Sequence, residues 1–526
     1  MIETEVPSRE GVKSRLLTLK EASEWASEFL NREVSEHNIS YLINYGRIRK
    51  YVINGKVYVS KEELKQYYIE NVLKKEEKYR KALGIDLCWE LSFDWVSERE
   101  RTKHVHRLHP YKGKFIPQLV EYFLSKYFKA GDIVLDPFCG SGTTLIQANE
   151  MNIHSIGIDI SEFNILITEV KFADVNIEEL KKCINGIFLK LREHEINNRI
   201  TEFEKELKKL LEEFNRKNFP SPQFKRDFQD GKIPKEYLIE KEKEFNKIYL
   251  ELLKKYGIRQ RENNSNSFLD KWYIPNVKEE AYIILDFINK IYDEKIKKVL
   301  MIILSRTIRS VRATTHMDLD RLKEPQYTPY YCYKHFKICK PVFSLIPTFK
   351  KYVKDTLKRL EEYKKLKTDA YQIALVGDSR TIDIFEEVKK KSKEFYELLK
   401  SKKITGIFTS PPYVGQIDYH EQHAYAYELF NIPRRDELEI GPMFKGKGKE
   451  ARESYIEGIS QALKNCLRFT VDNPVIIIVA NDEFNLYPII ANKVGLKILR
   501  EYKRPVLNRT SRDKNAYYES VFVMGR

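Results

Sequence analysis

The chain has 526 residues, which predicts two to four domains or one large domain with a big insertion. A hydrophobic fraction of 42% excludes global disorder, and only 21 Gly and 19 Pro exclude a collagen-like or linker-dominated chain. The 93 basic residues outnumber the 77 acidic ones, and the net charge of +16 favours a polyanionic partner, most often nucleic acid. A lysine-rich composition that serves only solubility is the alternative.

Cysteine usage and hydropathy predict a cytoplasmic protein. No run of about 18 apolar residues occurs, so we expect no membrane span, and the opening MIETEVPSREGVKSR lacks the apolar region of a signal peptide. The scattered cysteines form no Cys-X2-Cys pair, which predicts neither a disulfide framework nor a zinc ribbon. They are Cys88, Cys139, Cys183, Cys332, Cys339 and Cys466. The histidines of segment 104–109 have no cysteine or carboxylate at ligand spacing, so we expect no metal.

Residues 16–70 are predicted to form a small unit. An amphipathic helix begins at Thr18, a second helix ends before a glycine turn at Gly46, and a third helix follows a hairpin at Asn54-Gly55. This pattern resembles a winged helix-turn-helix of the excisionase or MerR type, although a helical module that only contacts proteins is the alternative. The resemblance implies a DNA-facing set, with Ser40, Tyr41 and Asn44 toward the groove and Arg47, Arg49 and Lys50 near phosphates.

The middle of the chain is predicted to be helical. Residues 70–85 indicate a charged helical linker, and an α/β pattern runs from about residue 105 to about residue 172. Residues 173–270 carry Lys, Glu, Leu and Ile at helical spacing, which predicts a helical insertion, and residues 280–325 give more helix. The basic stretch that ends this region contains Arg306, Arg309 and Arg312, which are candidates either for DNA contacts or for pairing with nearby acids.

A glycine-containing loop joins a predicted strand to a predicted helix in GDIVLDPFCGSGTTLIQANEMNIHSIGIDIS (131–161). The second strand ends on Asp159, which gives the βαβ arrangement of a nucleoside-binding fold. Gly140 and Gly142 would let the backbone approach a ligand, and Asp159 could accept ribose hydroxyls. Position 145 is Leu, so the third glycine of the dinucleotide pattern is absent, and no Gly-Lys-Ser/Thr of a P-loop follows.

DPFCGSGTT followed by GIDIS closely resembles the S-adenosylmethionine loop of amino-methyltransferases, which methylate exocyclic amino groups of bases, usually in DNA. The preceding HPYKGKF (109–115) matches the family's HPY-X-X-KF segment, and the Gly-Asp of ALVGDSRTI (374–382) matches the position that reaches the adenine end of the cofactor. The cofactor residues that this resemblance implies are Lys114, Phe115, Asp136, Pro137, Phe138, Gly140, Gly142, Thr143, Thr144, Asp159, Ile160 and Asp378.

A second motif follows the apolar strand ITGIFT (404–409). Ser410-Pro411-Pro412-Tyr413 has two fixed φ angles and lacks two N–H donors, so the turn is rigid and rich in hydrogen-bond acceptors. Such a turn suits a substrate amino group, which donates hydrogen bonds. Accepting hydrogen bonds from an exocyclic amine localises its lone pair and makes it a better nucleophile.

In the family that this motif resembles, the Ser hydroxyl (Ser410) and the first Pro carbonyl (Pro411) accept these bonds, beside Pro412. The Tyr (Tyr413) stacks on the flipped-out base. Ser at the first position is typical of the cytosine-N4 group, whereas Asp or Asn is usual in adenine-N6 enzymes. No Pro-Cys dipeptide of the cytosine-carbon enzymes occurs.

The resemblance implies an α/β fold: a Rossmann-like methyltransferase sheet with a large helical insertion and a small N-terminal winged helix-turn-helix domain. We expect residues 1–85 to bind DNA, 86–172 to hold the cofactor, 173–340 to form the insertion and 341–526 to be catalytic. The insertion is the first candidate for target recognition, and the loop GPMFKGKGKEAR (441–452) is a rival through Lys445 and Lys447.

The function that follows is a DNA cytosine-N4 methyltransferase using S-adenosylmethionine on double-stranded DNA near the nucleoid, with a cognate restriction endonuclease as a further partner. An adenine-N6 enzyme, an RNA base methyltransferase and a non-catalytic DNA-binding regulator are the alternatives.

Overall fold

The computed structural model describes residues 16–30, 34–44, 46–93, 96–196, 198–261, 267–319, 322–507 and 515–526. The opening of the chain, where we expected no signal peptide, lies outside them. The chain divides into two compact units. Unit 1 comprises residues 1–85, 202–258 and 314–341, and unit 2 comprises residues 86–201, 259–313 and 342–526. The predicted boundaries near residues 85 and 340 lie at unit boundaries, whereas the predicted insertion 173–340 is shared between the units.

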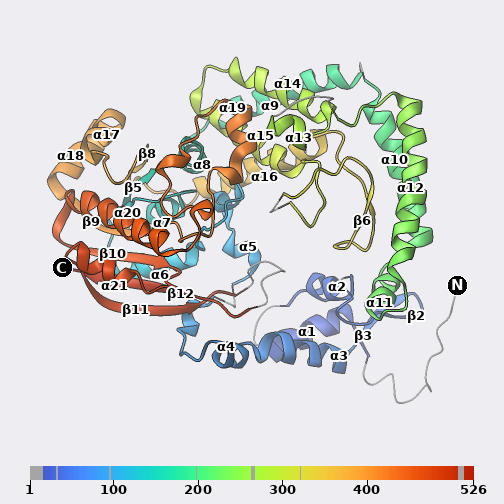
Figure 1. Ribbon diagram of the computed structural model, residues 1–526, viewed down its shortest axis with the longest axis horizontal. Coiled ribbons are helices and arrows are strands. Elements are labelled where there is room, and N and C mark those ends of the chain that lie inside the picture. The colour runs from blue at the N-terminus through green and yellow to red at the C-terminus, as the bar shows by residue number, and fades with distance from the viewer. Residues whose placement is uncertain are drawn as a thin grey trace. The chain divides into compact units, whose positions relative to one another are not determined.

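A seven-stranded sheet forms the centre of unit 2, in the order β11-β12-β10-β9-β4-β5-β8 (Figure 1). Its strands are β4 (Ile133–Asp136), β5 (His154–Asp159), β8 (Gln372–Val376), β9 (Ile404–Thr409), β10 (Thr470–Ala480), β11 (Lys497–Pro505) and β12 (Tyr518–Gly525). Strands β8, β5, β4, β9 and β10 run parallel to one another, and β12 runs antiparallel to β10 and β11. The predicted α/β sheet is confirmed.

Apolar side chains of the strands alternate between two cores, because successive residues of a strand point to opposite faces. On β10, Ile476 and Ile478 lie in one core, and Ile477 and Val479 lie in the other. Helices cover both cores, which explains why the central strands are nearly continuous apolar runs. The first core is covered by α17 (Ile384–Lys391), α18 (Lys393–Lys402), α20 (Lys449–Leu467) and α21 (Tyr487–Lys493), and the second by α6 (Pro117–Tyr127) and part of α7 (Thr143–Glu150).

Further helices of unit 2 surround this sheet. They are α5 (Glu98–Arg101), α8 (Glu162–Phe172), α9 (Ile177–Ile196), α13 (Phe268–Trp272), α14 (Pro275–Asn289), α15 (Glu294–Ser310), α16 (Ile346–Lys364) and α19 (Ala424–Phe430). Short 3-10 turns are formed by Trp89–Leu91, His104–Arg107, Glu421–His423, Asp436–Leu438 and Met443–Lys445. Helix α15 packs against α8, α14 and α16, so the sequence around residue 300 belongs to the core of unit 2.

The N-terminal part of unit 1 has a three-stranded sheet in the order β1-β3-β2. Asn54 and Gly55 both have positive φ, which is the conformation of a two-residue hairpin turn, and the predicted hairpin is confirmed. The elements are β1 (Leu16–Thr18), α1 (Leu19–Leu30), α2 (Glu36–Asn44), β2 (Tyr51–Ile53), β3 (Lys56–Ser60), α3 (Lys61–Tyr68), a π-helical turn (Ile69–Leu73) and α4 (Lys75–Leu83). The DNA-binding role that we expect of them stays a prediction.

The rest of unit 1 is a helical hairpin with a small sheet. Phe214 contacts Phe245, and Lys255 forms an ion pair with Glu206, so α10 and α12 lie antiparallel. The elements are α10 (Ile200–Asn218), α11 (Gln223–Gln229), α12 (Lys235–Tyr256), β6 (Tyr330–Cys332) and β7 (Lys337–Cys339). The helical character predicted for this segment is confirmed.

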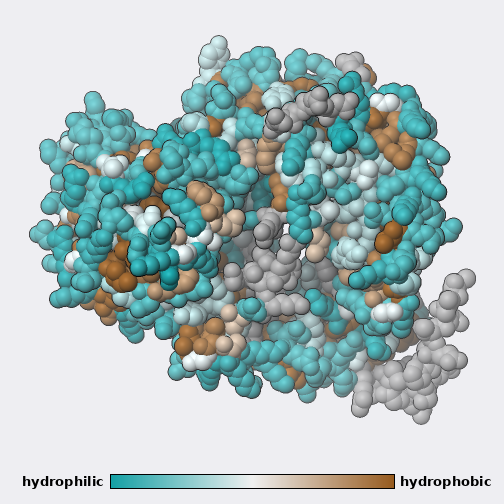
Figure 2. Space-filling view, in the orientation of Figure 1, coloured by the Kyte–Doolittle hydropathy of each residue, from teal (hydrophilic) through white to brown (hydrophobic). Residues whose placement is uncertain are grey.

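The visible surface is mainly hydrophilic, as expected for a chain with 32% charged residues (Figure 2). Among the described residues, no helix combines the length and the apolar character that crossing a membrane requires.

Candidate active site

The glycine loop and the Ser-Pro-Pro-Tyr turn follow neighbouring strands. β4 ends at Asp136, directly before the glycine loop, and β9, which ends at Thr409, runs parallel to β4. The chain passes from β4 to β5 on one side, whereas β9 lies on the other, so the strand order reverses here. Ligands of open α/β sheets bind outside the carboxyl ends of the strands at such a point.

The two glycines of the loop have different roles. Gly140 and Gly142 both have positive φ, +49° and +73°, which favours glycine. A Cβ at Gly140 would lie 2.8 Å from the Tyr111 hydroxyl, and one at Gly142 would lie 2.5 Å from Thr168 of α8. Gly140 lines the pocket. Gly142 does not line it, so its glycine is explained by the packing of the loop against α8 rather than by the predicted approach of a ligand.

Asp136 is a buried carboxylate at the end of β4. It accepts hydrogen bonds from the hydroxyls of Thr144 and Thr409, each at 2.6 Å, and from the backbone N–H of Phe138 at 3.1 Å. Burial raises the pKa of Asp136 to about 6, although these hydrogen bonds act in the opposite direction. Thr144 therefore holds Asp136 in place instead of lining the pocket.

Asp159 closes β5 and is held by three donors. The backbone N–H groups of Gly140 and Ser161 lie 3.0 Å and 2.8 Å from its oxygens, and the Asn164 side-chain amide lies 3.0 Å away. Burial raises the pKa of Asp159. Among the described residues, Oδ2 of Asp159 accepts a hydrogen bond from the Gly140 N–H alone, so this oxygen keeps capacity for a ligand hydroxyl.

Tyr413 of the second motif is fixed through its hydroxyl. The phenol donates to the Glu519 carboxylate at 2.9 Å, and Glu519 also accepts from the Arg504 guanidinium at 3.0 Å. Burial, reinforced by the charge of Glu519, raises the pKa of Tyr413 well above its ordinary value, while a hydrogen bond from the Ser410 side chain opposes the shift. The ring therefore has a defined orientation before any substrate arrives.

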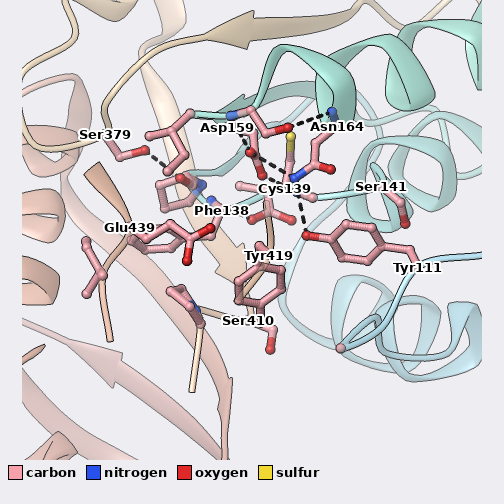
Figure 3. A pocket seen from close by; sticks show the side chains of 18 of the residues that line it. Tyr111, Phe138, Cys139, Ser141, Asp159, Asn164, Ser379, Ser410, Tyr419 and Glu439 are labelled. Carbon is pink, nitrogen blue, oxygen red and sulfur yellow. Dashed lines mark hydrogen bonds between the residues drawn. The ribbon is translucent and has the colours of Figure 1, made fainter. Parts of the chain in front are cut away.

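One pocket of about 840 Å3, including its open mouth, collects residues of both motifs (Figure 3). The predicted residues that line it are Lys114, Phe115, Asp136, Pro137, Phe138, Gly140, Thr143, Asp159, Ile160, Asp378, Ser410 and Pro412. Those that do not line it are Gly142, Thr144, Pro411 and Tyr413.

Asp378 lines the pocket, but its carboxylate is occupied by another residue. The Arg380 guanidinium donates to both of its oxygens, at 2.7–2.9 Å. Ser379, the next residue, donates to the Pro137 carbonyl at 2.5 Å and so ties the end of β8 to the glycine loop. A ligand at this wall would therefore meet a carboxylate whose charge is already paired with Arg380.

The sequence interpretation missed several residues at this site. Those that line the pocket are Tyr111, Gly113, Cys139, Ser141, Ser161, Asn164, Ser379, Tyr419, His420, Leu438, Glu439 and Ile440. Tyr111 belongs to the HPY-X-X-KF segment, so its motif could have identified it. The segments around residues 419 and 439 carry no such signal. A buried lysine, Lys171, donates to the Ser141 carbonyl and supports the glycine loop from α8.

Comparison with known proteins gives the family. Residues 26–169 match the N6_N4_Mtase model, described as DNA methylase. The type II methyltransferase M.MjaII of Methanocaldococcus jannaschii is 53% identical over 515 residues, which is 97% of each chain. The chain belongs to the type II DNA methyltransferases. The type II methyltransferase M.BsoBI of Geobacillus stearothermophilus is 34% identical over 94 residues, 17% of this chain and 18% of its own. The crystal structure of SMU.776 complexed with SAH covers 34% of this chain and 37% of that one at 15% identity, with a TM-score of 0.18, too slight a likeness to bear on the site.

The substrate of this methyltransferase is DNA, and its methyl donor is S-adenosylmethionine. The pocket fits such a ligand, because three of its lining residues carry buried polar atoms without a partner among the described residues. These atoms are Ser141 Oγ, Asn164 Oδ1 and His420 Nε2. Buried polar groups are normally satisfied, so a polar ligand is the natural partner.

His420 presents a ring nitrogen to the pocket. Its Nδ1 and backbone N–H lie 2.5 Å and 2.9 Å from the same Glu439 oxygen, which fixes the orientation of the ring. Nε2 is buried and has no partner among the described residues, so it is placed to hydrogen-bond a polar ligand at the pocket wall.

Two of the three candidate DNA contacts in the arginine stretch are buried. Arg306 is 6% exposed, and its guanidinium donates to Asp355 at 2.7 Å and lies 4.1 Å from the Tyr352 ring centre. Arg312 is 7% exposed, and its Nε donates to the Arg309 carbonyl. Arg306 and Arg312 therefore contribute to the packing of unit 2, whereas Arg309 is half-buried near the end of α15 and its DNA contact stays a prediction.

Other predicted DNA contacts lie on accessible surfaces. Ser40 is half-buried on α2, and the remaining N-terminal residues, Tyr41, Asn44, Arg47, Arg49 and Lys50, are exposed. Lys445 is exposed in its loop, and Lys447, also exposed, forms an ion pair with Glu483 at 2.8 Å.

The expectation that the protein has no metal site is not supported. Among the described residues, three groups of His, Cys or carboxylate side chains have one potential ligand atom each within 4.8 Å of the others. Two lie in unit 2, and one lies in unit 1. They are His104, His106 and Glu150; His420, Asp436 and Glu439; and His316, Cys332, His335 and Cys339.

Proposed function

We propose that this methyltransferase transfers a methyl group to the exocyclic N4 amino group of cytosine in double-stranded DNA. One observation carries the proposal: Ser410 and Pro412 line the same pocket as Asp136, Gly140 and Asp159. A serine at position 410, where adenine-N6 enzymes of the resembling family usually carry Asp or Asn, supports cytosine as the base.

The Ser-Pro-Pro-Tyr turn is suited to activate an amine. Ser410 Oγ and the Pro411 carbonyl can accept hydrogen bonds from the two N–H groups of the substrate amine. Neither Pro411 nor Pro412 has a backbone N–H that would compete as a donor. When bound, S-adenosylmethionine supplies a sulfonium methyl group. Holding amine and methyl group at one pocket would provide much of the rate by orientation.

Tyr413 is proposed to stack on the flipped-out base. A base in duplex DNA must leave the helix before its amino group can reach a pocket, and aromatic side chains commonly receive it. The hydrogen bond from Tyr413 to Glu519 fixes the ring in advance. Glu519 is a positioning residue in this proposal, because it acts on the base through Tyr413.

The proposed DNA-binding surfaces are the exposed residues of α2 with the basic turn after it, and the loop 441–452. Both carry exposed cations, which neutralise phosphates without reading sequence. The type II family supports a restriction–modification setting with a cognate endonuclease as partner. Target recognition would then involve the helical segments of the insertion or this loop.

The test is mass spectrometry of nucleosides from plasmid DNA incubated with the protein and labelled S-adenosylmethionine. Labelled N4-methylcytosine is the expected product. Labelled N6-methyladenine would overturn the interpretation of Ser410 while keeping the family. Label in RNA and not in DNA would favour an RNA base as substrate, and no labelled base with intact cofactor binding would favour a regulator.

A further inference from the structure

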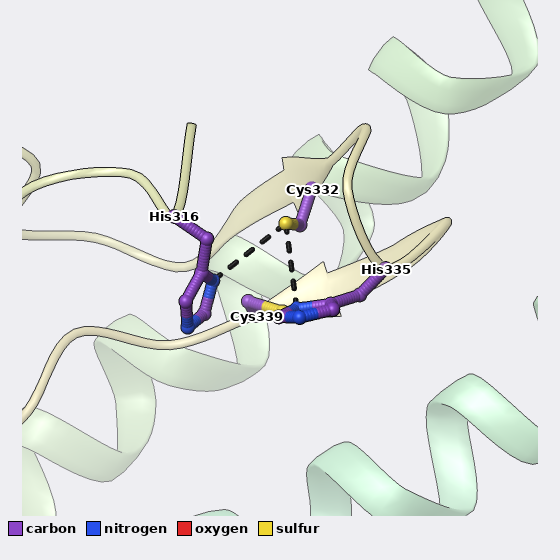
Figure 4. Close-up of side chains that lie close together, drawn as sticks. All are labelled: His316, Cys332, His335 and Cys339. Atoms are coloured by element: carbon purple, nitrogen blue, oxygen red, sulfur yellow. Dashed lines mark hydrogen bonds between the residues drawn. The ribbon is translucent and has the colours of Figure 1, made fainter. Parts of the chain in front are cut away.

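Two cysteines and two histidines of unit 1 point at one another (Figure 4). Cys332 and Cys339 belong to β6 and β7, His335 to the turn between them, and His316 to an earlier segment. We propose that His316, Cys332, His335 and Cys339 form a structural site for one divalent ion, with zinc as the preferred metal.

The distances agree with a tetrahedral ion. The Sγ of Cys332 lies 3.6 Å from Nδ1 of His316 and 3.6 Å from Nδ1 of His335. Nδ1 of His335 lies 3.5 Å from the Sγ of Cys339. Zinc bonds of about 2.3 Å to sulfur and about 2.05 Å to nitrogen, at tetrahedral angles, put sulfur and nitrogen about 3.6 Å apart. An ion therefore fits among the four atoms with little movement.

The ligand types select the metal and the role of the site. Two thiolates and two imidazoles suit zinc, whereas Mg²⁺ and Ca²⁺ prefer oxygen ligands. Four protein ligands leave no open position, which is typical of structural rather than catalytic zinc. Cys332 and Cys339 are 1% and 7% exposed, so this thiol pair is shielded from solvent.

The hairpin is shaped for ligation. Phe336 has a φ of +53°, and its backbone N–H donates to the Cys332 carbonyl at 2.7 Å, so the chain turns tightly after the first cysteine. The Tyr330 hydroxyl lies 2.8 Å from Nδ1 of His316 and accepts the His316 backbone N–H. An ion at Nδ1 would replace the first of these bonds and leave the second, so Tyr330 competes with the ion rather than binding it.

The hairpin is too small to be stable by itself, and a bound ion would supply additional stability. Its strands have three residues each, and a two-stranded sheet of this size is marginal by itself. Its buried core consists of Tyr330, Cys332 and Cys339. Hydrogen bonds connect it to α10 and α12, where Asn215 bonds both ways with Ile338 and Glu242 accepts from the Tyr331 N–H. Ion binding would lock the hairpin against these helices.

The experiment uses the full-length protein. Mass spectrometry of metals should find about one zinc per chain. After chelation, titration with Co²⁺ should produce the intense visible bands of tetrahedral cobalt together with sulfur-to-cobalt charge transfer. Cys339→Ser and His335→Ala should each reduce stoichiometric binding. Cys183→Ser, which changes a cysteine of α9 outside the cluster, is the matched control and should bind normally.

Two further variants keep the test decisive if a ligand variant fails to fold. His335→Cys should retain the ion and raise the charge-transfer intensity by roughly half, because three thiolates replace two. Tyr330→Phe should bind the ion at least as tightly as the original chain. Absence of stoichiometric metal, binding that survives Cys339→Ser and His335→Ala, octahedral cobalt spectra, or a Cys332–Cys339 disulfide in the purified protein would each overturn the proposal.

Discussion

The methyltransferase pocket and the His/Cys cluster obtain their geometry in different ways. The pocket lies at the ends of strands whose side chains are buried in two large cores, so apolar packing fixes its walls. Ser141, Asn164 and His420 there keep polar atoms that no other described residue satisfies. The hairpin of the cluster has a core of three residues, and two of them are the proposed ligands. The pocket should therefore keep its shape without its ligand, whereas the hairpin should depend on its ion.

The largest expected effect is loss of turnover in Ser410→Ala. Removing a polar group that acts in the transition state costs about 10²–10³ in kcat. The affinity for S-adenosylmethionine, measured by calorimetry, should stay unchanged because the cofactor walls of the pocket are built by other strands. Metal content should stay unchanged as well.

Ser401→Ala is the matched control for this variant. Ser401 is exposed near the end of α18 and donates to the Leu398 carbonyl, so its removal should leave kcat as it is. If Ser410→Ala weakens cofactor binding as much as turnover, Ser410 does not act on the substrate amine.

The second-largest expected effect is a loss of stability of unit 1 when the proposed ion is removed. A ligand present at 100 times its Kd stabilises the state that binds it by about 2.7 kcal/mol, and chelation should lower the free energy of unfolding by about this amount. Urea unfolding with and without added Zn²⁺ measures the difference. Cofactor affinity should be unchanged.

DNA affinity is expected to fall on chelation. Lys225 of α11 lies 4.9 Å from the Phe336 ring centre, and its neighbour Arg226 donates to the Ile48 carbonyl, beside the proposed phosphate contacts Arg47 and Arg49. Loss of the hairpin would loosen this turn. If chelation leaves the DNA affinity unchanged, the hairpin does not contribute to DNA binding. That result would not contradict the proposed metal site.

The sequence predicted those parts of the two sites that are contiguous. One short segment contains strand β4, the glycine loop and Asp159. Local turn and strand patterns are enough to predict all three. Tyr419, His420 and Glu439 were not predicted, because only tertiary folding brings their segments to the pocket. Local sequence patterns do not predict contacts between segments that are far apart in the chain.

The misses outside the pocket have two different causes. Cys332, His335 and Cys339 are spaced as Cys-X2-His-X3-Cys, a signal that a search for Cys-X2-Cys pairs overlooks, and His316 joins them only through the fold. Arg306 was a candidate for DNA binding because its surroundings are basic. Its partner Asp355 is far away in the sequence, so only the structure reveals that this arginine is buried and paired.

The fourth prediction concerns the pH dependence of cofactor binding in the pocket. Burial raises the pKa of Asp136 to about 6, so the carboxylate takes up a proton below that pH and loses its attraction for a cationic ligand. Affinity for S-adenosylmethionine should fall by up to about tenfold per pH unit below pH 6, as measured by calorimetry. In the ligand-free protein, the pH dependence of folding stability has the opposite sign to that of cofactor affinity. The raised pKa of Asp136 contributes to the free energy of unfolding below its ordinary value near 4, and this contribution is lost as the pH rises through 6.

Asp136→Asn tests the assignment of this pH dependence. The variant cannot ionise, so it should bind the cofactor more weakly at neutral pH and show no further loss between pH 7 and pH 5. The metal cluster should not contribute to this profile. A pH step that persists in Asp136→Asn would have to arise from another group of the pocket.

The smallest expected effect is that of Tyr413→Phe, which removes one hydrogen bond and keeps the ring. A hydrogen bond to a charged group contributes about 1.5–3 kcal/mol, but the ring remains packed, so we expect the lower end, about a tenfold fall in kcat/KM. Glu519→Gln should have a similar effect, because it acts through the same contact, and Tyr413→Ala should cost much more because the stacking surface is lost. Fluorescence of 2-aminopurine at the target base reports base flipping directly. If Tyr413→Phe and Tyr413→Ala reduce flipping equally, the hydroxyl rather than the ring is what matters, and the pocket is less preorganised than its packed cores indicate.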